Sequence, residues 1–271
     1  MTIMRGISAA ELLDAWEEGS AKTSAERAVE LLALVSLETS RERLIALSLG
    51  LRDAALLTLR ETLFGSQMVG VVVCPECGER LDLTFETQQI RSGRQALDPE
   101  SNLASGRESD EACGHESDAE FAVSAEGYEL RFRPANSGDA MAIAGQSDGV
   151  GADLDFARGL LLKRCLLSAN DAGVAIESDQ IPPEVAEIAV QRMAEADPMA
   201  DIELAMTCPA CARQWSAALD IVSFLWTEIE VWAWRLLNEV HALASAYGWS
   251  ERDILAMSAN RRQCYLRMVW A

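Results

Sequence analysis

The chain has 271 residues, 49% of them apolar, and its 43 acidic against 23 basic side chains give a formal net charge of −20. This charge makes it a poor candidate for binding the phosphate backbone of nucleic acids, which depends on clustered Lys and Arg. No run of about 18 apolar residues occurs, so we expect no membrane span. The start of the sequence lacks the basic and apolar regions of a secretory signal, so we expect the protein in the cytoplasm.

Residues 1–65 are predicted to form a helical N-terminal region of four short helices. The S/T-x-x-E capping box, which marks helix starts, occurs three times ahead of runs with apolar residues at helical spacing. The three boxes are Ser8–Glu11, Thr23–Glu26 and Thr39–Glu42. A fourth run, LRDAALLTLRETLF, ends at Gly65, a residue that suits the C-terminal cap of a helix.

In two similar segments, residues 66–90 and 200–221, apolar and polar residues alternate with a period of two and do not follow the spacing of a helix. In the first, a short apolar run precedes CPEC and the alternating run LDLTFE follows it. In the second, IELAMT and RQWSAALDI flank CPAC in the same way. Alternation of this kind predicts strands, so each Cys-Pro-x-Cys unit is expected at the tip of a β-hairpin.

The stretch between these hairpins is predicted to be an insertion. Residues 91–119 are polar, acidic and rich in Gly and Ser, which indicates a flexible loop. Residues 120–199 are predicted to hold a hairpin turning at Gly127, helices over 137–145 and 154–168, and a helix beginning near Pro183.

The C-terminal region, residues 222–271, is rich in tryptophan and is predicted to be helical. Apolar residues spaced by threes and fours predict one long amphipathic helix over 222–247, followed by short helices from Ser250 and from Asn260. Trp226 and Trp234 lie off the main apolar stripe of the long helix, so we expect them to bind a partner protein, because interfaces are enriched in Trp. Cys165 and Cys264 are interpreted as small core residues.

Four cysteines, Cys74, Cys77, Cys208 and Cys211, form the clearest functional pattern. Two hairpin tips that each supply two thiolates to one tetrahedral metal make a zinc ribbon. Four sulfur ligands favour Zn²⁺ or iron over Mg²⁺ or Ca²⁺. Between Cys77 and Cys208 lie 130 residues, against about 15–20 in a compact ribbon, so the ends of the insertion must return together.

A closed site of four cysteines leaves no open coordination position, so the metal is expected to be structural, with one zinc ion per chain. A redox role for the CPxC pairs is disfavoured, since thiol oxidoreductases place one such pair at a helix N-terminus. The pair Cys113 and His115 is interpreted as incidental, and His241 as a surface or packing residue. No nucleophile motif or phosphate loop is present, so no catalytic residues are predicted.

Long segments of the chain resemble the T4-type phage baseplate hub proteins and hub assembly chaperones, including relatives encoded with phage-tail-like contractile injection systems. The resembling segments include SLGLRDAALLTLRETLFGSQMVGVVVCPECGERLDL, LRFRPANSGDA, LLLKRCLL, and the run from ADPMADIELAMTCPACARQW through YGWSERDIL to RRQCYLRMV. The part of the last run from the second CPxC through YGWSERDIL to RRQCYL is the most specific. The resemblance implies a role in the baseplate of a contractile tail, either as a structural subunit or as an assembly factor.

We therefore predict an α+β fold, mostly helical, with a zinc-ribbon-like pair of β-hairpins split by a long insertion. The predicted protein is not an enzyme, and it binds other baseplate or tail hub proteins. An alternative is a zinc-ribbon module that binds nucleic acid or the transcription machinery. The hairpins disfavour this alternative, because Arg80 and Arg213 are outnumbered by acidic residues. A metal-dependent hydrolase would need one ligand replaced by water.

Overall fold

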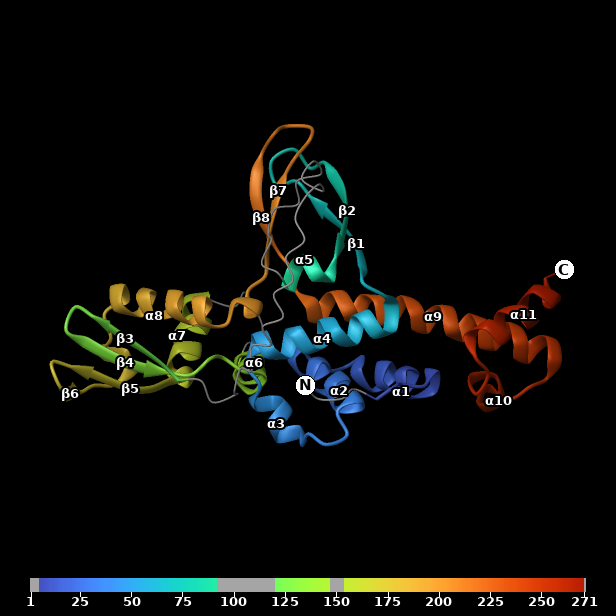
Figure 1. The fold of residues 1–271 in the computed structure, drawn as a ribbon, viewed down its shortest axis with the longest axis horizontal. Helices are drawn as coiled ribbons and strands as arrows, with labels where there is room; N and C mark the ends of the chain where they lie inside the picture. The colour runs from blue at the N-terminus through green and yellow to red at the C-terminus, as the bar shows by residue number, and fades with distance from the viewer. Residues whose placement is uncertain (1–4, 92–119, 147–153, 271) are drawn as a thin grey trace, which may run out of the picture. The chain divides into compact units, whose positions relative to one another are not determined.

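The computed structural model describes residues 5–91, 120–146 and 154–270 (Figure 1). The chain divides into two compact units, one made of Met1–Arg41 with Val222–Ala271, and the other of Glu42–Ile221. The fold is α+β, as predicted, with helices and three small antiparallel sheets among the described residues. The predicted acidic loop 91–119 lies outside the described residues except for Arg91, as do Cys113 and His115. In the part that is described, no helix is long and apolar enough to cross a membrane.

The first unit consists of helices from both ends of the chain. Its helices are α1 (Ala9–Gly19), α2 (Ser24–Val35), α9 (Ile221–Tyr247, of which only Ile221 belongs to the other unit), α10 (Glu251–Leu255) and α11 (Ala259–Val269). The capping boxes of Ser8 and Thr23 are both formed, with side chain and backbone hydrogen-bonded in each direction. The long C-terminal helix and the two short ones after it are therefore confirmed, as are the first two caps.

Two clusters of buried side chains hold this unit together. Leu13 of α1 packs with Ala233 and Leu236 of α9, and the half-buried Trp16 and Trp232 lie against them. The second cluster joins the C-terminal half of α9 to the short helices, through Val240, Leu243, Ile254 and Leu266. Side chains such as Leu243, which is fully buried, are each worth about 1.5–3 kcal/mol of burial.

Among the described residues, the second unit contains the strands and the remaining helices, except that Arg41 at the start of α3 belongs to the first unit. The helices are α3 (Arg41–Ala46), α4 (Leu49–Phe64), α5 (Thr87–Arg91), α6 (Ser137–Ala144), α7 (Leu154–Cys165) and α8 (Pro183–Ala196), with short 3₁₀ turns η1 (Ser178–Gln180) and η2 (Pro198–Ala200). The strands are β1 (Gln67–Val73), β2 (Arg80–Glu86), β3 (Phe121–Ala125), β4 (Tyr128–Phe132), β5 (Leu166–Asp171), β6 (Val174–Ala175), β7 (Glu203–Thr207) and β8 (Gln214–Ala218). Helix α3 starts one residue later than a cap at Thr39 predicts.

The insertion forms its own four-stranded sheet, in the order β3-β4-β5-β6. The predicted hairpin at Gly127 is confirmed: Glu126 and Gly127 both have positive φ, 55° and 91°, as a two-residue hairpin turn of the primed type requires. Helix α8 packs on β3. The shared core consists of Val123, Leu130, Phe132, Leu162, Ala169, Ile181, Val185 and Ala189.

The prediction of one helix over 154–168 was wrong at its end. Helix α7 stops at Cys165, and the following LLSAND is strand β5, which pairs with β4. Pairing with β4 and burial of Ala169 in the sheet core outweigh the helical preference of the leucines. The turn signal Asp171-Ala172-Gly173, with φ values of 46° and 86° at its last two residues, marks the end of this strand.

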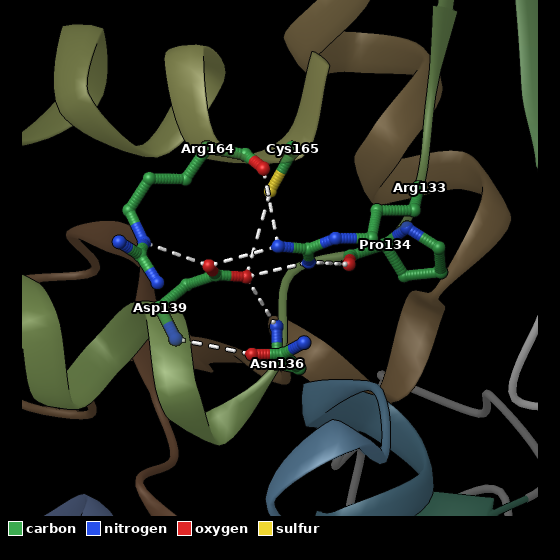
Figure 2. A network of polar contacts seen from close by, with 6 residues as sticks. All are labelled: Arg133, Pro134, Asn136, Asp139, Arg164 and Cys165. Carbon is green, nitrogen blue, oxygen red and sulfur yellow. Dashed lines mark hydrogen bonds and ion pairs between the residues drawn. The ribbon is translucent and has the colours of Figure 1, made fainter. Parts of the chain in front are cut away.

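A buried carboxylate organises the junction between the sheet and its helices (Figure 2). Asp139 of α6 is fully buried, and Arg133 donates to both of its carboxylate oxygens at 2.7 and 3.0 Å. The Nε of Arg164, near the end of α7, donates to the same carboxylate at 2.8 Å. Asn136 completes a capping box with Asp139 at the start of α6. The network thus fixes the end of β4, the start of α6 and the end of α7 against one another.

The network also sets the charge state of this carboxyl group. Burial alone would raise the pKa of Asp139, but hydrogen bonds from Arg133, from the Asn136 backbone and from Arg164 outweigh burial and lower it. Cys165 is completely buried beside this group, which confirms it as a core residue, and burial raises the pKa of its thiol to about 12. Cys264, by contrast, is exposed, so its assignment to the core was wrong: it lies on the outer side of α11.

Contact between α4 and η2 brings together the segments from which the two hairpins start. Helix α4 leads into β1, and η2 leads into β7. Asp197, just before η2, accepts a hydrogen bond of 2.9 Å from the backbone N–H of Gly50. A Cβ atom at position 50 would lie 1.9 Å from the Asp197 carboxylate, so this close approach requires glycine. The contact between α4 and η2 thus holds the starts of the two hairpins next to each other, which allows their tips to form one site.

Candidate metal centre

The first hairpin turns at Cys74 to Glu79. Strands β1 and β2 pair from Gln67 with Glu86 to Val73 with Arg80. Beyond the last pair, the Cys74 N–H donates to the Glu79 carbonyl at 2.9 Å, and the Gly78 N–H donates back to the Cys74 carbonyl at 3.0 Å. Gly78 has a φ of +75°, a left-handed conformation that closes the turn and lets Cys74 and Cys77 face the same point.

The second hairpin repeats this turn almost bond for bond. Cys208 N–H donates to the Arg213 carbonyl at 2.9 Å, and Ala212 N–H donates to the Cys208 carbonyl at 2.9 Å. Ala212 occupies the place of Gly78 and also has a positive φ, of 57°. The two predicted strand–turn–strand units are therefore confirmed as equivalent hairpins, which Figure 1 shows as β1-β2 and β7-β8.

This equivalence gives a matched pair of substitutions. Gly78→Ala is expected to lower the free energy of unfolding by about 1 kcal/mol, because a side chain is disfavoured in the left-handed region. Apart from its neighbours in the chain, no atom of the described residues lies within 4 Å of the added Cβ, so the expected loss comes from the backbone conformation. Ala212→Gly relieves the same strain but adds chain entropy to the unfolded state, and should stay within about 0.5 kcal/mol of wild type. Chemical denaturation measures both, and equal losses in the two variants would contradict the account.

The four sulfur atoms converge on one point between the hairpin tips. The Cys74 and Cys211 sulfurs lie 3.7 Å apart, and those of Cys77 and Cys208 lie 3.6 Å apart. All four lie within 4.8 Å of one another. A tetrahedral ion with metal–sulfur bonds of about 2.3 Å places its ligands about 3.8 Å apart. Since each close pair takes one cysteine from each hairpin, a bound ion would join the two hairpins.

Backbone N–H groups of the turns point at the sulfur atoms. The N–H groups of Cys77 and Glu76 lower the pKa of the Cys74 thiol to about 7. The Glu79 N–H acts in the same direction on Cys77, but neighbouring sulfurs and desolvation outweigh it and raise the pKa of Cys77 to about 12. The pKa of Cys211 is raised as well, despite the Arg213 N–H that acts to lower it. The raised pKa values of Cys77 and Cys211 show that thiolates this close disfavour one another, so all four cysteines would ionise together only around a cation.

The composition of the site limits what it can do. Cys74 and Cys208 are buried, whereas Cys77 and Cys211 are exposed. Within the described ranges, these four residues form the only cluster of three or more potential metal ligands. The four cysteines could hold one metal ion and would fill a tetrahedral coordination shell, which is the arrangement of structural sites.

The two tryptophans predicted to bind a partner differ in their surroundings. Trp226 is only 7% exposed. The Arg27 guanidinium lies 4.3 Å from its ring centroid, and a Cβ at Gly19 would lie 2.3 Å from the indole. Trp226 is thus a core residue of the first unit, and the partner-binding prediction stays with Trp234, which is 56% exposed. His241 is on the exposed side of α9.

Comparison with known proteins identifies the family of the chain. A family model described as "T4 bacteriophage base plate protein" matches residues 9–226. The chain belongs to this T4 base plate protein family. The matched residues include both hairpins and all four cysteines. The run expected to be the most specific part of the resemblance extends from the second CPxC through YGWSERDIL to RRQCYL. The match ends inside α9, so it contains the beginning of this run but not YGWSERDIL or RRQCYL. Searches of curated proteins and of solved structures found no match.

Proposed function

We propose that this base plate family protein is a non-enzymatic baseplate component or baseplate assembly factor of a contractile phage tail or phage-tail-like injection system. It acts by binding other baseplate or tail hub proteins. The observation that supports this best is the family match, which extends over residues 9–226. A role without catalysis agrees with a cysteine cluster whose four ligands complete a tetrahedral shell.

The ion in our proposal is one structural zinc per chain, held by Cys74, Cys77, Cys208 and Cys211. Four thiolate ligands suit zinc, and the sulfur separations of 3.6 and 3.7 Å suit its bond length. Zinc would supply the positive charge that the clustered thiolates require. Its role would be to keep together two hairpins that are separated by more than a hundred residues of chain.

The proposed partner-binding surface of the first unit centres on Trp234. Its ring meets Trp16 edge-on, with ring centroids 5.8 Å apart, so part of its surface is held in place by α1. Val231, three residues earlier on α9, is 55% exposed. Residues three apart on a helix are neighbours, so the two side chains form one exposed apolar surface. Tryptophan is enriched at interfaces and among the residues that contribute most to binding.

Deletion of the gene, followed by electron microscopy of the particles, tests the assembly role. We expect defective baseplates, restored when the wild-type gene is supplied. Normal baseplates in the deletion strain would refute the proposal.

Complementation with Trp234→Ala should restore fewer particles than complementation with Trp270→Ala, which removes another exposed tryptophan of the same unit (72% exposed). Equal complementation by both variants would remove Trp234 from the proposed surface.

A further inference from the structure

The outward face of β1 is aliphatic. Val69, Val71 and Val73 alternate along the strand and are 60%, 53% and 54% exposed. The strand, QMVGVVV, contains no charged residue and no proline. Proteins ordinarily protect such edges with Lys, Pro or a bulge, because an unprotected apolar strand pairs with other chains. This edge has none of these devices.

The same three valines present free backbone groups. In an antiparallel pair, residues that exchange hydrogen bonds with the partner strand alternate with residues whose N–H and C=O point the other way. At one end of the hairpin the Cys74 N–H donates to the Glu79 carbonyl, and at the other the Thr87 N–H donates to the Ser66 carbonyl. The even-numbered residues of β1 therefore direct their backbone groups to β2. Val69, Val71 and Val73 therefore direct their N–H and C=O groups to the opposite edge. Among the described residues, no strand pairs with β1 on that side.

The equivalent strand of the second hairpin is different. With Cys208 in the place of Cys74, the counterparts of the three valines are Glu203, Ala205 and Thr207, all exposed. A charged, a small and a polar residue thus occupy positions where β1 has three valines. Folding of the hairpin and formation of the cysteine cluster do not require valine there, since β7 manages both without it.

We propose that β1 pairs antiparallel with β1 of a second copy of this chain, about a two-fold axis at Val71. The valine pattern is symmetric about this residue, so the axis would place Val69 opposite Val73 of the partner and Val71 opposite itself. The two hairpins would then form one continuous four-stranded sheet, with isologous contacts as two-fold symmetry requires. The inference goes beyond the proposed function and does not depend on it.

The net charge of the chain predicts how this dimerisation depends on salt concentration. Two chains of −20 each repel, so backbone pairing and cross-strand contacts between valines must overcome that repulsion. Salt screens charge over about 8–10 Å at physiological ionic strength, so dimerisation through β1 should strengthen as salt is added. An association driven by opposite charges would weaken instead.

The oligomeric state of the metal-loaded protein, measured by analytical ultracentrifugation over a concentration series, tests the proposal. We expect a monomer–dimer equilibrium that Val71→Lys shifts at least tenfold towards monomer. The control, Ala205→Lys, places the same charge at the equivalent site of β7 and should leave the equilibrium unchanged. Both positions are exposed, and zinc content and circular dichroism establish that the variants fold. A wild-type monomer at every concentration, or equal behaviour of the two variants, would overturn the proposal.

Cross-linking tests the register separately. Paired residues that exchange hydrogen bonds have Cα atoms about 5.5 Å apart, within the range for a disulfide. In metal-loaded protein under mild oxidation, Val71→Cys should therefore form a disulfide-linked dimer. Val69→Cys should not, because the two-fold register offsets the two copies of residue 69 by four residues, about 13 Å. Faster cross-linking at 69 than at 71 would rule out the axis at Val71.

Discussion

Replacing Cys208 with serine is expected to abolish tight metal binding and to separate the two hairpins. A structural zinc contributes about 10–16 kcal/mol in small zinc fingers. Shared among four ligands, that implies a loss of about 3 kcal/mol in the free energy of unfolding for one cysteine. The loss should be seen as a lower denaturation midpoint of the second unit, together with loss of bound metal after dialysis.

The size of this effect follows from how little else supports the hairpins. Each is a two-stranded sheet, and such sheets are marginally stable in water by themselves. On β7 only Leu204 and Met206 are buried, and on β1 only Met68. The matched control is Cys264→Ser, which removes an exposed cysteine in α11 and should leave both stability and metal content unchanged. Wild-type stability in Cys208→Ser would contradict the structural role of the site.

Replacing Asp139 with alanine is expected to lower the free energy of unfolding by about 3 kcal/mol. Removal of one partner from a buried charge pair typically costs 3–5 kcal/mol, because it leaves the other charge without compensation. The lower end applies here, since the Arg133 and Arg164 side chains are 30% and 39% exposed and can regain water. One of the two hydrogen bonds in the capping box of α6 is lost as well, because the Asp139 carboxylate accepts from the Asn136 N–H at 3.1 Å.

The matched control for this substitution is Glu187→Ala. Glu187 forms an ion pair with Arg158, but both side chains are largely exposed, and such surface pairs are worth about 0–1 kcal/mol. Urea denaturation of the two variants should therefore differ by about 2 kcal/mol. Equal stability of the two would show that the buried network contributes no more than a surface pair.

The lowered pKa of Asp139 predicts how this contribution depends on pH. A carboxyl group with a lower pKa in the folded than in the unfolded state stabilises the fold above its unfolded pKa of about 3.9. That stabilisation disappears as the pH falls through the folded value. The stability difference between wild type and Asp139→Asn should thus be constant near neutral pH and shrink below about pH 4. A difference that grows towards acid would contradict the pKa direction.

Local patterns predicted the elements that local interactions form. The caps at Ser8 and Thr23 involve residues three apart, so their sequence pattern is sufficient to predict them. The CPxC units likewise place their ligands within one turn, and their repetition indicated a shared site. The spacing of the cysteines could not indicate the contact between Gly50 and Asp197, which brings the starts of the two hairpins together from distant positions in the sequence.

The failures concern contacts between distant segments. The strand after Cys165 was missed because its leucines continue the helical run, and only pairing with β4 distinguishes strand from helix there. Periodicity within α9 suggested that Trp226 is free, yet Gly19 and Arg27 of other segments cover it. The Asp139 network escaped notice for the same reason, since Arg164 lies 25 residues further along the chain.

X-ray absorption at the zinc edge, on freshly purified protein under reducing conditions, tests most directly whether four cysteines form one metal centre that joins the hairpins. The account predicts a single zinc environment with four sulfur ligands at about 2.3 Å. Absence of metal from the folded protein, or a shell with nitrogen or oxygen in place of sulfur, would contradict it.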